Sequence, residues 1–167
     1  MRAAEVIDAP RIACVRVETW RAAYRGQIPD AVLDALDVER SAVLFREQIG
    51  QRRGLLLVAE DDGGVIGFCD LIPSRDKDAD PKMAAEIVAI YILPAYWRKG
   101  AGRMLCDRAR AQARKDGYKT VTLWVLSSND AARQFYEAMC FRLDGAAKTD
   151  KTSDGSELHE VRFRMTI

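Results

Sequence analysis

The sequence predicts an α+β fold in which helices flank a mixed central β-sheet. Two segments with helical spacing of apolar residues come first, and a glycine-rich turn then joins two apolar, strand-like runs. A strand, a helix, a strand, a short helix and two more strands complete the order. With 167 residues, of which 49% are hydrophobic and 31% charged, the chain is expected to form a single domain over residues 1–167.

The first elements are a short strand predicted at residues 1–7 and two helices. Pro10 favours the start of a helix, which runs through Tyr24 and ends at Gly26. After a turn, apolar residues on one side of the segment 38–51 predict a second helix. These helices precede the sheet.

The sheet is predicted from apolar runs and the turns between them. Two runs, residues 54–60 and 65–73, flank Asp-Asp-Gly-Gly, and a glycine-rich turn between apolar runs indicates a β-hairpin. The later elements are predicted as a strand at 85–93, a helix at 100–116, a strand at 119–126, a helix at 130–138, and strands at 142–149 and 158–165.

A glycine pair opens the helix that follows the predicted central strand, in the segment EIVAIYILPAYWRKGAGRML at residues 86–105. Gly100 and Gly102 allow the backbone to come close to a ligand, and the free amides of the first helical turn face an anion. Cations at a helix N-terminus oppose the helix dipole, and a bound anion resolves that conflict. The cations here are Arg98, Lys99 and Arg103. The segment therefore predicts a phosphate-binding site.

Two common phosphate loops do not fit this segment. A P-loop requires Lys followed by Ser or Thr after its last glycine, and the dinucleotide fingerprint requires a third glycine where this chain has Leu105. The expected anion is therefore neither a P-loop nucleotide nor NAD.

The hexapeptide WRKGAG, with Gly100 and Gly102, resembles the coenzyme-binding motif of the GNAT superfamily of acyl-CoA-dependent N-acetyltransferases. Trp97 stands where that motif has Arg or Gln. A second segment, VTLWVLSSNDAARQFYEAMCF at residues 121–141, resembles the family pattern of a strand, an Asn, a short helix with a Tyr, and Gly-Phe; here Cys140 replaces the Gly. The resemblance extends over about residues 58–141 and implies a GNAT-like fold.

The resemblance implies acetyl-CoA as co-substrate. In that family, backbone groups of the central strand pair with the pantetheine arm, the helix start cradles the pyrophosphate, and the Asn hydrogen-bonds the arm. The implied coenzyme-binding residues are Ile90, Tyr91, Ile92, Arg98, Lys99, Gly100, Ala101, Gly102, Arg103, Met104 and Asn129.

Amide synthesis from a thioester needs proton transfer, because an amine with a pKa near 10 is mostly protonated at neutral pH. The resemblance implies that Glu86 is the general base, directly or through water, and that Tyr136 is the acid that protonates the coenzyme sulfur. The structural alternatives are a salt bridge for Glu86 and packing against Phe135 for Tyr136. Trp20 and Tyr24, four residues apart on one helix face, either line the acceptor pocket or pack into the core.

Several classes of function are disfavoured. The formal net charge of +1 gives no reason to expect nucleic acid as a partner. The N-terminus lacks a long apolar run, so neither a signal peptide nor a membrane span is expected. His159 is the only histidine, which gives no support to a metal site or a Ser-His-Asp triad. Trp124 is expected in the core. The scattered cysteines predict reduced thiols and a cytoplasmic location; they are Cys14, Cys69, Cys106 and Cys140.

The function predicted from these features is transfer of an acetyl group from acetyl-CoA to a primary amine of a small molecule, directly and without metal. A protein N-terminus or lysine side chain is the alternative acceptor. Two other classes stay open: a non-catalytic acyl-CoA sensor module, and a nucleotide-phosphate binder outside the family. Family members are often homodimers, and the resemblance allows that state here.

Overall fold

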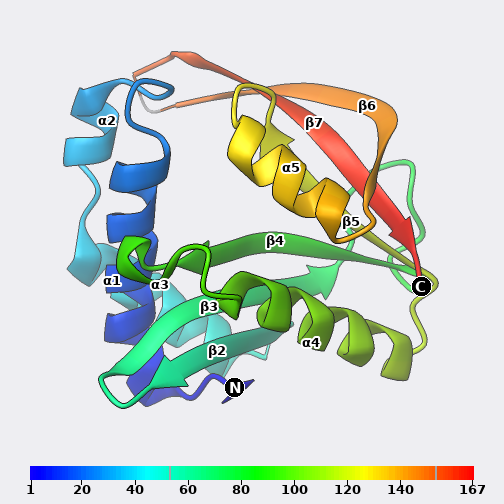
Figure 1. Cartoon of the computed structure of the whole chain (residues 1–167), viewed down its shortest axis with the longest axis horizontal. Coiled ribbons are helices and arrows are strands. Elements are labelled where there is room, and N and C mark those ends of the chain that lie inside the picture. The colour runs from blue at the N-terminus through cyan, green and yellow to red at the C-terminus, as the bar shows by residue number, and fades with distance from the viewer. Residues whose placement is uncertain (53, 153) are drawn as a thin grey trace.

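The computed structural model describes residues 1–52, 54–152 and 154–167 and confirms the predicted α+β class (Figure 1). In this part of the chain, seven strands form one sheet in the order β1-β2-β3-β4-β5-β7-β6. Only β4 and β5 are parallel neighbours; the other adjacent strands are antiparallel, so the sheet is mixed as predicted.

The elements follow the predicted order closely. The strands are β1 Arg2–Ala3, β2 Leu55–Asp61, β3 Gly64–Pro73, β4 Ala84–Ile92, β5 Thr120–Leu126, β6 Arg142–Lys151 and β7 Glu157–Thr166. The α-helices are α1 Ala9–Ala23, α2 Asp30–Asp34, α3 Val38–Gly50, α4 Ala101–Lys115 and α5 Asp130–Ala138, and the short 3₁₀ helices are η1 Val6–Asp8 and η2 Pro94–Tyr96.

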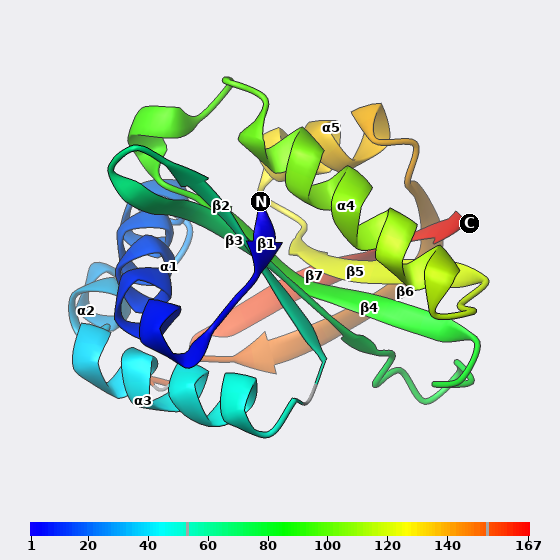
Figure 2. The same cartoon turned by 90° about the horizontal axis from the view of Figure 1, so that it is seen from below.

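Helices cover both faces of the sheet. Figure 2 shows α4 and α5 over one face, while α1 and α3 pack together over the other. Apolar side chains from both layers bury against the strands, among them Ile12 of α1, Phe68 of β3 and Leu105 of α4. A second, smaller apolar cluster joins α2 to the end of β5 through Leu33 and Leu126.

The first predicted strand is much shorter than expected. Its residues 1–7 give a two-residue strand and then the turn η1, and Arg2 forms an ion pair with Asp8 at 2.6 Å. Arg2 also pairs with Glu60 of β2 at 2.7 Å. The Ala4 amide still donates to the Leu56 carbonyl of β2 at 2.7 Å before η1 begins. The helix α2, between the two predicted helices, was not predicted.

The sheet opens between its two parallel strands. β4 and β5 are paired only from Ala84 opposite Thr120 to Ile87 opposite Leu123. On the other side of β4 the register with β3 shifts, so that Val88 is left without a partner, which is a β-bulge. A bulge bends its strand and increases its local twist. The remainder of β4 therefore diverges from β5 and leaves a cleft between them.

Asp70 of β3 gives a pH-dependent prediction for stability. Its side chain is 8% exposed, its Oδ1 has no hydrogen-bond partner among the described residues, and burial raises the pKa of its carboxyl above the ordinary 3.8. A carboxyl whose pKa is higher in the folded than in the unfolded protein contributes its full stabilisation below the unfolded pKa of about 4. That stabilisation is lost as the pH rises through the higher pKa of the folded state. We expect Asp70→Asn to raise Tm at pH 7.5 and to raise it less at pH 4, measured by thermal unfolding. Equal shifts at both pH values would contradict this.

Candidate active site

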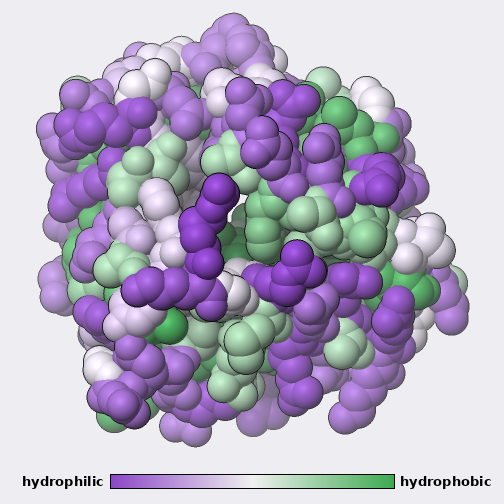
Figure 3. Space-filling model, in the orientation of Figure 1, coloured by the Kyte–Doolittle hydropathy of each residue, from purple (hydrophilic) through white to green (hydrophobic). Residues whose placement is uncertain are grey.

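A cavity of about 810 Å³ fills the cleft between β4 and β5. Figure 3 shows this hollow near the centre of the face, with hydrophobic side chains inside and hydrophilic ones around its rim. Most of the site residues predicted from the sequence line it: Trp20, Tyr24, Ile90, Tyr91, Ile92, Arg98, Gly100, Ala101, Gly102, Arg103, Asn129 and Tyr136. The cavity lining does not include Glu86, Lys99 or Met104.

One end of the cavity is the N-terminus of α4. Gly100 is the N-cap, with φ of 91°, and no side chain caps the helix. Arg98 also has a positive φ, 62°. Such a left-handed turn before a helix directs successive backbone N–H groups toward one point, which favours an anion. Arg98 and Arg103 supply positive charge at the same end.

Two residues of the predicted pyrophosphate cradle, Lys99 and Met104, lie outside the cavity lining. The Met104 amide donates to the Gly100 carbonyl at 3.1 Å, so it is already used within the helix, and its side chain is 59% exposed. The Lys99 ammonium lies 5.4 Å from the centre of the Tyr96 ring. Neither residue lines the cavity.

The open edge of β4 forms a long wall of the cavity. Leu93 donates to Ile66 of β3 at 2.9 Å. Hydrogen-bonded and non-hydrogen-bonded pairs alternate along an antiparallel ladder, so Tyr91 directs its backbone groups to β3, whereas Ile90 and Ile92 direct theirs to the cleft. This direction favours Ile90 and Ile92 over Tyr91 for backbone pairing with a pantetheine arm, although Tyr91 also lines the cavity.

Trp97, which stands in place of a polar residue of the motif, has a structural role that the sequence did not indicate. Its indole Nε1 donates to the Ile92 carbonyl at 2.6 Å. The Thr19 hydroxyl donates to the same carbonyl at 3.0 Å. These two bonds fasten the end of β4 to α1 and to the turn before α4. They occupy the Ile92 carbonyl, whereas Ile90 keeps both of its backbone polar groups at the cleft.

Helix α5 supplies the opposite wall. Asn129 caps it, its Oδ1 accepting from the Ala132 amide at 3.1 Å, so its side-chain NH₂ group is left to donate into the cavity. Tyr136 lies near the C-terminal end of α5. Its ring packs against those of Phe141 and Phe163, at centroid distances of 5.9 and 6.2 Å. Burial raises the pKa of the Tyr136 phenol well above 10, so this group stays protonated at neutral pH.

Glu86 is not in the position that a base acting on a cavity ligand requires. Its side chain is 4% exposed, and both carboxylate oxygens are held by the Arg75 guanidinium, at 2.5 and 3.0 Å. The Arg75 amide donates to the same carboxylate at 3.2 Å. The structure thus gives Glu86 the alternative role, a salt bridge that fastens the β3–β4 loop to β4, and this position counts against the predicted base role.

The other end of the cavity is aromatic and was only partly predicted. Trp20 and Tyr24 meet edge to face at 5.1 Å, and Tyr91 lies 6.5 Å from Trp20. Trp124, expected in the core, instead lines this end and donates to Asp76 at 2.9 Å. Glu160 of β7 lines it too and was not predicted. Strand alternation predicts only that Glu160 and Arg162 share one face of β7, and the register with β5 then places Glu160 opposite Leu126.

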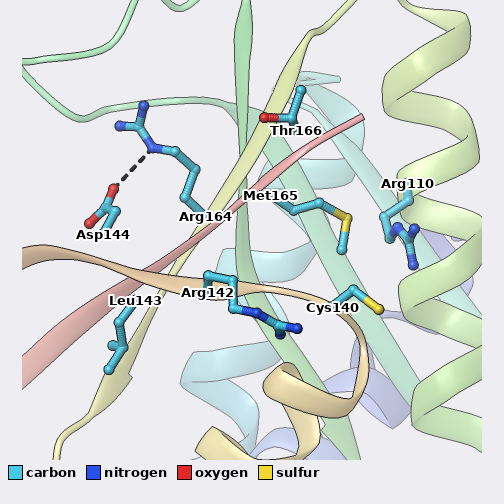
Figure 4. A pocket seen from close by; sticks show the side chains of 8 residues that line it. All are labelled: Arg110, Cys140, Arg142, Leu143, Asp144, Arg164, Met165 and Thr166. Carbon is cyan, nitrogen blue, oxygen red and sulfur yellow. Dashed lines mark hydrogen bonds and ion pairs between the residues drawn. The ribbon is translucent and has the colours of Figure 1, made fainter.

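A second cavity, of about 420 Å³, lies between α4, the start of β6 and the end of β7 (Figure 4). Its arginines are engaged: Arg110 with Asp107 at 3.2 Å, Arg142 with two backbone carbonyls, and Arg164 with Asp144 at 2.9 Å. Cys140 lies on its wall. None of the predicted site residues is found there.

The part of the chain that the structure describes holds no cluster of three His, Cys, Asp or Glu side chains suited to a metal ion. Within the same residues, no helix is both long and apolar enough to cross a membrane.

Comparison with known proteins places this arrangement in a family. An uncharacterized N-acetyltransferase of Mycobacterium tuberculosis is 30% identical over 139 residues, which cover 83% of this chain and 85% of that relative. The solved PaiA N-acetyltransferase of Thermoplasma acidophilum, in complex with coenzyme A, has a TM-score of 0.80 at 21% identity, covering 99% of this chain and 97% of that one.

A second solved structure, YncA of Salmonella typhimurium with its cofactor acetyl-CoA, has a TM-score of 0.73 at 22% identity and covers 99% of this chain and 91% of that one. The chain also matches the Acetyltransferase (GNAT) family over residues 17–141, which is more than half of its length. The protein therefore belongs to the GNAT family of acetyltransferases.

Proposed function

We propose that the protein transfers the acetyl group of acetyl-CoA directly to a primary amine of a small molecule. The observation that carries this proposal is that one cavity connects the anion-binding turn at Gly100 with the aromatic end at Trp20 and Tyr24. A coenzyme and an acceptor can therefore meet inside it. A recessed cavity lined by residues of α1, α5 and β7 suits a small acceptor better than a folded protein surface.

The residues present fit a CoA thioester. The turn at Arg98 and Gly100 and the uncapped start of α4 suit the pyrophosphate. The cleft-facing backbone groups of Ile90 can pair with the amides of an extended arm, as an added strand does. The Asn129 NH₂ group can donate to the same arm. When bound, the coenzyme supplies an acetyl group activated as a thioester.

Tyr136 is the acid in this proposal. Its hydroxyl donates a proton to the sulfur as the carbon–sulfur bond breaks and the amine nitrogen forms the new bond to the acetyl carbon. The buried phenol is protonated at neutral pH, which is the form that a proton donor must have. Once the phenol has given up its proton, it takes back the one that the new amide nitrogen must lose, through solvent.

Gly100 tests where the pyrophosphate binds. An ideal Cβ built there meets no atom within 4 Å, so a small side chain fits, although the positive φ strains any residue other than glycine. We expect Gly100→Asp to weaken acetyl-CoA binding by about 1–2 kcal/mol, roughly 5- to 30-fold, through charge repulsion. Gly100→Asn is the matched control, since it has the same shape and tolerance of positive φ without the charge. Equal affinities of the two variants, measured by calorimetry, would contradict the placement.

The proposed function is tested first by thermal unfolding with acetyl-CoA, and with ATP and NAD as controls. A ligand at about 100 times its Kd stabilises the folded protein by roughly 2.7 kcal/mol. A shift with acetyl-CoA alone supports the coenzyme, and thiol release in the presence of amines then supports turnover. A shift without thiol release for any amine, peptide N-termini and lysine peptides included, points to a non-catalytic sensor. Equal shifts with ATP or NAD point to a nucleotide binder.

A further inference from the structure

We propose that Glu160 binds a second positive charge on the acceptor, so that the acceptor is a diamine or a related polycationic alkylamine. The inference rests on the proposed function, because it names the class of amine that enters the same cavity. The reacting amine and the bound charge are different groups of one molecule.

The charges that line the cavity are segregated. Its cationic side chains in the described chain, Arg98 and Arg103, are at the α4 end. Among the described residues, the carboxylates that line the cavity are those of Asp130 and Glu160. Asp130 lies at the start of α5 and its side chain is 78% exposed, whereas Glu160 lies at the aromatic end and its side chain is 20% exposed. A ligand that is anionic at one end of the cavity and cationic at the other matches this distribution.

Glu160 is fixed at that end by the sheet. It lies on β7 directly opposite Leu126 of β5, whose side chain belongs to the small apolar cluster with Ile28 and Leu33. Burial in this setting raises the pKa of the Glu160 carboxyl, while a neighbouring ammonium, Lys148, lowers it. A partly buried carboxylate needs a cation as partner, since an unpaired one is costly.

Lys148 is that partner in the ligand-free protein, and it can be exchanged. Its Nζ is 3.0 Å from Glu160 Oε2 and 3.1 Å from Asp150, and its side chain is 36% exposed. When a ligand ammonium takes its place at Glu160, Lys148 keeps its ion pair with Asp150, which is 58% exposed, and its contact with water. The exchange leaves every charge with a partner.

The aromatic walls favour the same ligand. The Arg16 guanidinium lies 4.9 Å from the Trp20 ring centre and the Lys148 ammonium 4.8 Å from that of Trp124, so both indoles already contact cations. Tyr24 closes the wall beside Trp20. An alkyl chain packs against these rings while its terminal ammonium reaches Glu160.

A fixed carboxylate suits an ammonium group that stays charged during the reaction better than it suits the nitrogen that attacks the thioester. The amine must be neutral to attack the thioester, and an ion pair with a carboxylate would raise the pKa of its ammonium and hold it in the unreactive form. Glu160 therefore contributes most to an acceptor whose second ammonium stays charged through the reaction.

Three acceptors that differ only at the far end test this: 1,6-diaminohexane, hexylamine and 6-aminohexanoate. We expect the wild-type KM to be about tenfold lower for the diamine than for hexylamine, the value for one charge-assisted hydrogen bond, and highest for 6-aminohexanoate. Binding of the diamine to the protein–CoA complex is measured in parallel by calorimetry, so the result does not depend on turnover.

Variants assign the preference to Glu160. Glu160→Gln should abolish the tenfold advantage of the diamine while leaving the KM of hexylamine within about twofold. Lys148→Met removes the competing ammonium and should tighten diamine binding. Asp130→Asn, which removes the charge of the other carboxylate in the cavity lining, is the control and should leave the preference in place.

The outcomes separate this inference from the proposed function. A wild-type protein without diamine preference, or a Glu160→Gln variant that keeps it, overturns the role of Glu160 even when acetyl transfer is observed. Loss of the acetyl-CoA thermal shift in the wild type would instead overturn the proposed function, and calorimetry of the diamine with the coenzyme-free protein would still report on Glu160. If Glu160→Gln does not fold, unchanged or weaker diamine binding by Lys148→Met overturns the inference.

Discussion

Replacing Tyr136 with Phe is expected to lower kcat about 10²- to 10³-fold and to leave the affinity for acetyl-CoA within about twofold. The substitution keeps the ring that packs against Phe135, Phe141 and Phe163 and removes only the hydroxyl. Loss of a proton donor acts on the transition state, so kcat falls while ground-state binding persists. Steady-state thiol release gives kcat, and calorimetry gives the affinity for the coenzyme.

Tyr24→Phe is the matched control for this experiment. Tyr24 lines the same cavity from α1 and its phenol is also buried, so the change removes an equivalent hydroxyl from the opposite wall. We expect its kcat to fall less than tenfold. If Tyr136→Phe keeps the wild-type kcat, Tyr136 is a packing residue and the acid must be sought elsewhere.

The largest effect on stability is expected for Arg162→Met. The Arg162 side chain is 5% exposed and forms ion pairs with Asp76 at 3.0 Å, Asp78 at 2.7 Å and Asp144 at 2.9 Å. Its removal leaves Asp76, which is 11% exposed, without a counter-ion. Breaking such a partly buried pair should lower the free energy of unfolding by about 2–4 kcal/mol, and Tm by roughly 5–15 °C.

Arg164→Met provides the comparison, because Arg164 pairs with the same Asp144 at 2.9 Å but is 38% exposed. Loss of the Arg164 ion pair should lower the free energy of unfolding by about 1 kcal/mol or less. Similar losses of Tm for the two variants would show that burial does not govern the contribution of this network. The network also holds the β3–β4 loop, since Asp76 accepts from Trp124 at the aromatic end of the cavity.

The positions of most elements were predictable because local sequence determines them. The helix predicted at residues 130–138 is α5 itself, capped by Asn129, and that predicted at 100–116 is α4 with one residue fewer at each end. Gly100 could be identified as a coenzyme-site candidate for the same reason: the left-handed turn and the helix that follows it are encoded by adjacent residues.

The sequence by itself thus determined the α+β order, the glycine turn before α4 and the family resemblance. The tertiary structure decided which side chains reach the cavity. The ion pair with Arg75 holds Glu86 outside the cavity lining. The bulge at Val88 lets β4 diverge from β5 and so opens the cleft. Glu160 was brought opposite Leu126 by the pairing of β5 with β7. Each of these depends on the register between strands that are distant in the chain. A shift by one residue would turn every side chain to the other face, and local patterns do not specify that register.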